Sequence, residues 1–112
     1  MTNKNEKVAI QFLKGQDEKG FPEIRLFRND NGKKGTATYK FKNPSTITVE
    51  NLNLITKMYL IDKEGEISTK RIELSISDNY VKEVKSTYSW NSEIEFERFM
   101  RFSERYARSH TI

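Results

Sequence analysis

Apolar and polar residues alternate along most of the chain, which is the pattern of β-strands that bury one face. Glycine, proline, asparagine and aspartate interrupt the alternation at intervals and predict the turns between strands. The strands are expected at residues 8–13, 23–28, 35–41, 55–61, 66–76 and 80–90.

The connections between these strands carry further information. Asp30, Asn31 and Gly32 tolerate positive φ and predict a tight hairpin, so the strands on either side should pair antiparallel. We expect a loop with at most one helical turn at residues 45–53. Ile67 breaks the alternation within residues 66–76, which indicates a bulge near residues 68–70.

After Trp90 the apolar period changes from two residues to about 3.6, which predicts a helix. Ser92 and Glu95 have the spacing of a capping box, so the helix should begin at Ser92. Its apolar face comprises Phe96, Phe99, Met100, Phe102, Tyr106 and Ala107. Its opposite face carries Arg98, Arg101, Arg105 and Arg108, which we expect to be solvated and paired with Glu97 and Glu104 on the same helix.

These elements predict an α+β fold: a single-domain antiparallel β-sheet of about five or six strands, with a C-terminal α-helix packed on one face. The 112 residues suit one domain. We expect a flexible tail at 1–7, the sheet at 8–90 and the helix at 92–109. The N-terminus lacks the apolar stretch of a secretory signal, so the protein should stay in the compartment where it is made.

The composition limits the kinds of binding and catalysis that the sequence supports. The net charge of +4 favours anionic partners, and the absence of cysteine excludes disulfides and thiolate chemistry. The only histidine, His110, lies near the end of the chain, and the acidic residues fall in turns and at the helix start, where local roles account for them. We therefore predict no catalytic residue, no cofactor site and no metal site, and we expect that the protein is not an enzyme.

Two surfaces are candidates for binding a partner protein. The threonine-rich strand at residues 35–41 suits an exposed sheet edge, where unpaired backbone groups can accept another strand. The arginine face of the helix is the other candidate. The predicted partner-binding residues are Thr36, Thr38, Lys40, Lys42, Arg98, Arg101 and Arg105.

An RNA-binding module is the alternative interpretation. Residues 34–41 resemble the central strand of an RNA-recognition domain, in which solvent-facing aromatic side chains stack on bases. The corresponding outward positions here are Thr36 and Thr38, so the stacking platform is missing. We expect no nucleic acid partner, but the alternative stays open at this point.

Three segments together resemble one known family. They are residues 35–44 (GTATYKFKNP), residues 58–67 (MYLIDKEGEI) and the helix run at residues 97–107 (ERFMRFSERYA). Their order and spacing are similar to those of the photosystem II reaction-centre assembly proteins of the Psb28 family. The resemblance extends from Ile10 to Ala107. Ser103 departs from it, because the family usually has methionine there.

The resemblance implies a soluble, cofactor-free assembly factor with an antiparallel sheet and a C-terminal helix. It implies a peripheral location at the cytoplasmic or stromal face of the thylakoid membrane. The expected partners are photosystem II assembly intermediates that contain the larger core-antenna subunit and reaction-centre subunits. We expect the protein itself to be a monomer.

Overall fold

The computed structural model describes residues 7–29 and 31–110. The predicted tail lies outside these residues except for Lys7, which forms an ion pair with Asp17. The elements in chain order are β1 (Ala9–Leu13), β2 (Gln16–Asp17), β3 (Glu23–Arg28), β4 (Gly35–Lys42), the 3₁₀ helix η1 (Val49–Leu54), β5 (Met58–Asp62), β6 (Gly65–Thr69), β7 (Ile72–Ser77), β8 (Tyr80–Trp90) and α1 (Glu93–Ser109).

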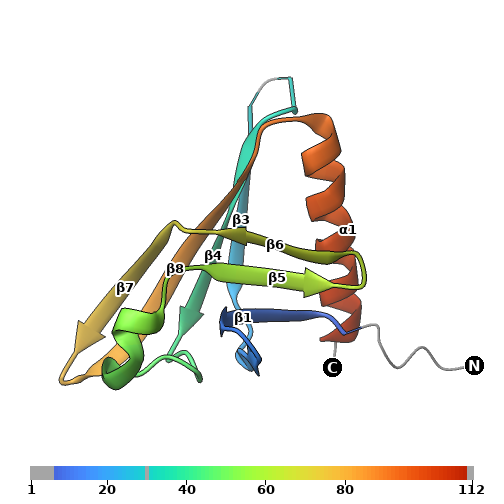
Figure 1. Cartoon of the computed structure of the whole chain (residues 1–112). Helices are drawn as coiled ribbons and strands as arrows, with labels where there is room; N and C mark the ends of the chain where they lie inside the picture. The colour runs from blue at the N-terminus through green and yellow to red at the C-terminus, as the bar shows by residue number, and fades with distance from the viewer. Residues whose placement is uncertain (1–6, 30, 111–112) are drawn as a thin grey trace, which may run out of the picture.

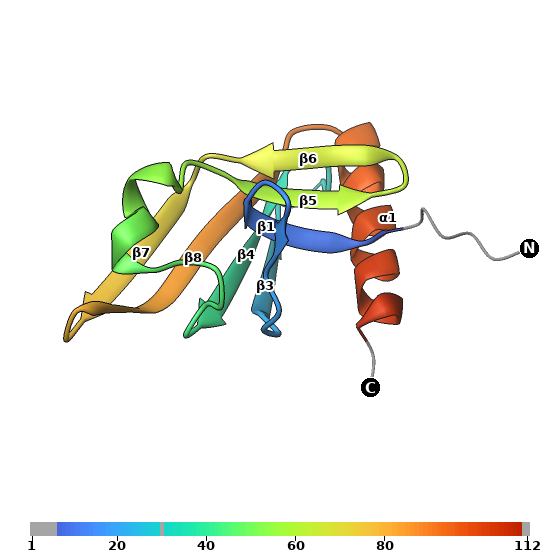
Figure 2. The ribbon, with the colours of Figure 1, turned by 60° about the horizontal axis from the view of Figure 1, so that its bottom comes forward.

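The strands form two antiparallel sheets. The β1 sheet has the order β2-β1-β5-β6, and the β4 sheet has the order β3-β4-β8-β7. Figures 1 and 2 show the β1 sheet crossing the β4 sheet, with α1 standing at the end of the β1 sheet. The predicted α+β class, the antiparallel pairing and the C-terminal helix are confirmed, although the described strands divide between two sheets and number eight rather than five or six.

The core lies between the two sheets and the helix. Ala37, Tyr39 and Phe41 are buried, as the alternation along β4 predicted. Large side chains from the other elements complete the core and are almost fully buried: Ile10, Phe12, Met58, Leu60, Val84, Trp90, Phe99 and Phe102. Packing of this kind is the main contribution to the stability of a small domain.

The expected single strand at residues 66–76 is wrong, because the chain leaves one sheet for the other in the middle of it. β6 ends at Thr69 and β7 begins at Ile72. The corner is closed by hydrogen bonds to β8: Thr69 Oγ1 donates to the Thr87 carbonyl at 2.7 Å, and the Arg71 carbonyl accepts from Thr87 N at 3.1 Å. These bonds satisfy backbone groups that a continuous ladder would otherwise have paired.

Glu18 connects two loops that are far apart in the sequence. Its carboxylate is buried and accepts hydrogen bonds from the backbone N–H and hydroxyl groups of Ser45 and Thr46, at 2.6 to 3.1 Å. The two-residue strand β2 lies just before it, and η1 follows the Ser45 loop. The purely local role expected for Glu18 is therefore wrong, since its four hydrogen bonds cross between the loops.

The helix begins where the capping pattern predicted. Ser92 Oγ accepts from Glu95 N at 3.2 Å, and Glu95 Oε1 accepts from the N–H of Asn91 at 2.6 Å, one residue earlier than expected. Phe99, Phe102 and Tyr106 are buried, and Phe96 and Met100 are partly buried against the core. Ala107, which was predicted on the same apolar face, is exposed. Over the described residues, no helix combines the length and apolarity needed to cross a membrane.

Candidate partner-binding surface

Four of the predicted partner-binding residues lie together on the outer face of the β4 sheet. Thr36, Thr38, Lys40 and Lys42 alternate with the buried residues of β4, so their side chains point away from the core. Thr38 Oγ1 lies 3.3 Å from the hydroxyl of Thr87 on β8. The structure thus places these four side chains on one polar surface, as the alternation predicted.

The expectation that this strand is a sheet edge is wrong. β4 pairs along its whole length with β8, and from Gly35 to Lys40 it also pairs with β3. Its backbone groups are therefore used within the sheet and are not free to accept another strand. The edges of the β4 sheet are β3 and β7.

β3 presents an open edge. Antiparallel pairs alternate between hydrogen-bonded and non-hydrogen-bonded types, and the bond from Asn29 N to the Lys34 carbonyl fixes the alternation. By this alternation Ile24, Leu26 and Arg28 direct their N–H and C=O groups away from β4. Every residue of β3 is exposed, and among the described residues β3 has no strand partner besides β4.

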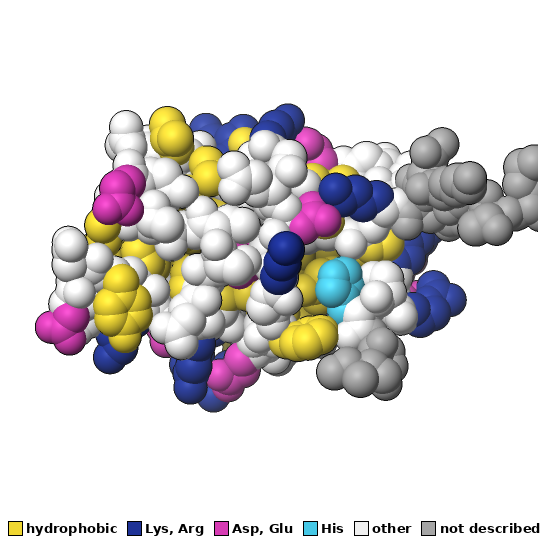
Figure 3. Space-filling model, turned by 90° about the horizontal axis from the view of Figure 1, so that it is seen from below, with side chains coloured by type: hydrophobic (Ala, Val, Ile, Leu, Met, Phe, Trp, Pro, Cys, Tyr) yellow, Lys and Arg dark blue, Asp and Glu magenta, His cyan; other side chains and the backbone are white. Residues whose placement is uncertain are grey.

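Large apolar side chains gather along this edge. Phe21 and Phe27 are 61% and 68% exposed, and Ile24 and Leu26 are about half exposed. A shallow groove of about 190 Å³ separates this segment from α1; it is lined by Phe21, Pro22, Ile24, Tyr39, Ser103, Tyr106, Ala107 and His110. Figure 3 shows hydrophobic side chains beside His110, the single histidine. Exposed apolar surface concentrated in this way is characteristic of interaction sites.

A basic depression adjoins the same edge on the outer face of the β4 sheet. It is lined by Glu23, Arg25, Thr38, Lys40 and Lys85. Glu23 pairs with Arg25 at 3.2 Å and with Lys40 at 3.7 Å, while Lys85 pairs with Glu73 on β7 at 3.4 Å. Three cations face one carboxylate within the depression, so acidic side chains of a partner would be attracted to it.

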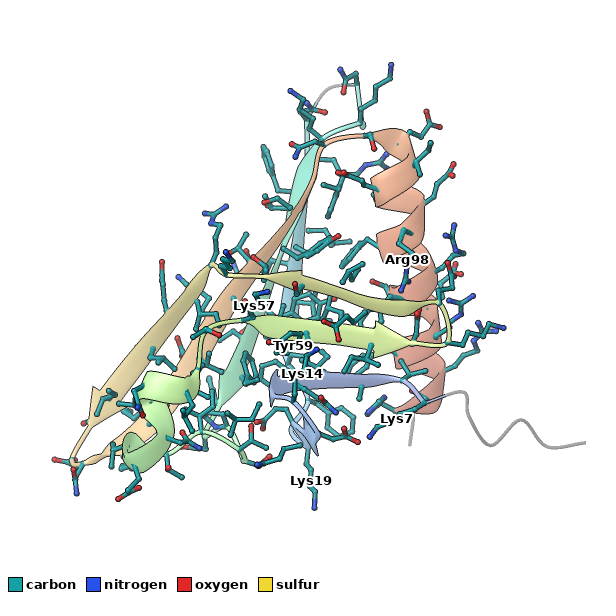
Figure 4. All side chains as sticks on the ribbon, in the orientation of Figure 1. Lys7, Lys14, Lys19, Lys57, Tyr59 and Arg98 are labelled. Carbon is teal, nitrogen blue, oxygen red and sulfur yellow. The ribbon has the colours of Figure 1, made fainter. Side chains whose placement is uncertain are left out.

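The arginines of α1 are arranged differently from the prediction. Arg98 reaches the β5–β6 turn, where it donates two hydrogen bonds to Asp62, at 2.9 and 2.7 Å (Figure 4). Arg105 also bonds Asp62, at 2.9 Å, and Arg101 binds Glu64 through two bonds, at 2.7 and 2.9 Å. We call these five residues the carboxylate–arginine cluster.

The expected solvated arginine face is therefore wrong for two of its members. The side chains of Arg98 and Arg105 are only 16% and 19% exposed, and that of Asp62 is fully buried. The reason is that the β1 sheet extends over α1, so that α1 packs against the core on one side and against the β5–β6 turn on another. Arg101 remains 46% exposed.

The cluster holds both carboxylates in the ionised state. Burial acts to raise the pKa of Asp62, but hydrogen bonds from Arg98 and Arg105 outweigh it, so the pKa lies below its ordinary value. Hydrogen bonds from Arg101 and then Arg105 lower the pKa of Glu64 from 4.5 to about 2. Protonating either carboxylate would weaken the attachment of the β5–β6 turn to α1.

We expect the stability of the protein to fall steeply in acid. A carboxylate with a depressed pKa in the folded state contributes stability above its unfolded pKa, and the contribution is lost as the pH falls toward the folded pKa. For Glu64 this window runs from pH 4.5 down to about 2.

Urea unfolding of the wild type and of Glu64→Gln should differ clearly at pH 7 and converge near pH 2. Glu50→Gln, which changes an exposed carboxylate on η1, is the control. A constant difference between wild type and Glu64→Gln across this range would contradict the role given to Glu64.

The side-chain positions bear on two predictions, that the protein has no metal site and that it has no nucleic acid partner. Within residues 7–29 and 31–110, no group of three or more His, Asp or Glu side chains is arranged to hold a metal ion. Tyr39 and Phe41 are both 1% exposed, so neither aromatic ring is available to stack on a base. His110 stacks on the ring of Tyr106 with centroids 4.0 Å apart.

Comparisons with known proteins agree over almost the whole chain. Residues 10–112 match the family described as Psb28 protein. The chain is 66% identical over 109 residues to the photosystem II reaction center Psb28 protein of Prochlorococcus marinus (strain NATL2A), covering 97% of this chain and 96% of that protein. It is 43% identical over 106 residues to the protein of the same name from Synechococcus sp. (strain CC9605), covering 95% and 84% respectively.

Proposed function

Because the chain belongs to the Psb28 family, we propose that it is a non-enzymatic assembly factor that binds photosystem II assembly intermediates. Its relatives are named as photosystem II reaction center proteins, which supports a role with this complex. The proposed partners are the larger core-antenna subunit and reaction-centre subunits. The proposed place is the cytoplasmic or stromal face of the thylakoid membrane, where the protein is peripheral.

The observation that carries the proposal is the open edge of β3. An extended segment of a partner can add to such an edge as a further strand, because the outward N–H and C=O groups of Ile24, Leu26 and Arg28 supply its backbone hydrogen bonds. Alternate side chains of that segment would then face opposite sides of the sheet. Those on one side enter the apolar groove beside α1, and those on the other side meet the basic depression.

The predicted partner-binding residues divide into two roles in this arrangement. Thr36, Thr38, Lys40 and Lys42 form the outer surface beside the added strand. Arg98, Arg101 and Arg105 lie in the carboxylate–arginine cluster, which fixes the β1 sheet to α1. Of these three, Arg101 has the most exposed side chain and could also contact a partner. The RNA-binding alternative has less support, since Tyr39 and Phe41 are buried.

Affinity purification of the tagged chain from thylakoids, with identification of the co-purified subunits, tests the proposal. The wild type should recover photosystem II core-antenna and reaction-centre subunits. Leu26→Pro should lower the recovery at least tenfold, because proline removes an outward N–H group and cannot donate to an added strand. The fold should persist in this variant, since Leu26 is 54% exposed and its N–H group points away from β4.

Two further variants make the result specific. Ile94→Ala removes a side chain of α1 that is 78% exposed and lines neither the apolar groove nor the basic depression, so it should leave the recovery unchanged. Lys40→Glu with Lys42→Glu should reduce recovery and make the remainder insensitive to salt. Absence of photosystem II subunits from the wild-type sample would refute the function. Full recovery with a folded Leu26→Pro variant would refute the edge as the contact.

A further inference from the structure

The outer face of the β1 sheet carries lysines around one tyrosine. In β5, Met58 and Leu60 point into the core, so that Tyr59 between them points outward, and Lys57 lies just before the strand. Lys14 Nζ lies 5.2 Å from the centroid of the Tyr59 ring. Figure 4 shows the side chains that we call the lysine face, on or beside this sheet: Lys7, Lys14, Lys19, Lys57 and Tyr59.

The lysine face has an excess of positive charge. Lys7 pairs with Asp17 at 3.1 Å and Lys14 pairs with Glu66 at 3.3 Å. Lys19 and Lys57 have no carboxylate within ion-pair distance among the described residues. Four lysines therefore face two carboxylates. The side chains of Lys7 and Lys14 are more than half exposed, so their ion pairs can exchange for contacts with an external anion.

The arrangement suits an extended anionic surface better than a single small anion. The lysines are spread across and around the sheet and do not converge on one point (Figure 4). Their long flexible stems can adapt to mobile charges while the ammonium groups stay in water. Tyrosine and lysine are typical of the boundary between lipid headgroups and water. A single tyrosine does not form the platform of two or three rings on which RNA bases stack.

We propose that the lysine face rests on anionic lipid headgroups and gives the protein a weak electrostatic contact with a membrane surface. The contact lies on a different sheet from the open edge of β3, so both could be made at once. It goes beyond the proposed function and does not depend on it, because it needs lipid alone. Its strength should depend on lysine charge and should fall with ionic strength.

Co-sedimentation with vesicles tests the inference directly. The full chain should sediment with vesicles of phosphatidylcholine mixed with phosphatidylglycerol and not with vesicles of phosphatidylcholine alone. Added salt should release it. Each lysine near an anionic surface contributes about fivefold to membrane partitioning. Lys14→Gln with Lys57→Gln should therefore lower partitioning about 25-fold.

A matched variant separates the lysine face from net charge. Lys40→Gln with Lys85→Gln removes the same charge from the outer face of the β4 sheet and should change partitioning less than about twofold. Equal losses in the two variants, or no binding of the wild type to anionic vesicles, would overturn the inference. Binding to single-stranded RNA but not to vesicles, with the same dependence on Lys14 and Lys57, would assign the face to nucleic acid instead.

Discussion

Replacing Phe99 with alanine should lower the free energy of unfolding by about 3–5 kcal/mol. Phe99 is fully buried and is the point where α1 meets the β4 sheet. Its ring stacks on those of Tyr88 and Trp90, with centroids 5.6 and 5.1 Å away. Alanine would leave a cavity beside the rings of Tyr88 and Trp90, which the backbone of β8 holds in place, so collapse around it should be incomplete.

Urea unfolding followed by circular dichroism measures this loss. Ile94→Ala is the control on the same helix, since Ile94 is 78% exposed, and its effect should stay within about 0.5 kcal/mol. A loss below about 1 kcal/mol for Phe99→Ala would show that the helix does not depend on this contact for its attachment to the sheet.

Replacing Asp62 with alanine should lower the free energy of unfolding by about 3 kcal/mol, because it leaves two partly buried arginines without their buried partner. Asp62 is the shared acceptor of Arg98 and Arg105, and it also accepts from Glu64 N at 3.0 Å. The arginines retain some access to water and to Glu64, so the effect belongs at the lower end of the range for broken buried ion pairs.

Asp17→Ala is the matched control for this prediction, because Asp17 pairs with Lys7 at 3.1 Å but is 44% exposed. It should change stability by less than about 1 kcal/mol. Equal effects of the two substitutions would contradict the view that the carboxylate–arginine cluster holds the β5–β6 turn against α1.

Local periodicity was a good guide to which face of each element is buried. The alternation along β4 correctly placed Tyr39 in the core and Thr38 outside it, and the 3.6-residue period after Trp90 identified Phe99 and Phe102 as core residues. Both successes rest on the same cause. The repeat of a strand or helix fixes the direction of each side chain, whatever the element packs against.

Pairing between distant segments could not be predicted in this way. Arg98 and Asp62 are 36 residues apart, and Glu18 and Ser45 are 27 apart, so no local pattern connects them. Strand order also depends on pairing between distant segments, and it is strand order that makes β3 and not β4 the edge of the sheet. For this reason the predicted binding edge was one strand away from the observed edge. The prediction of which β4 side chains lie on the outer face was correct.

Hydrogen exchange on the chain bound to a photosystem II assembly intermediate tests strand addition at β3 residue by residue. Strand addition at β3 predicts that the amides of Ile24, Leu26 and Arg28, which point away from β4, exchange more slowly in the complex than in the free chain. The amides of β7, at the opposite edge of the β4 sheet, should be unchanged. Slowed exchange at β7 with none at β3 would refute strand addition at β3.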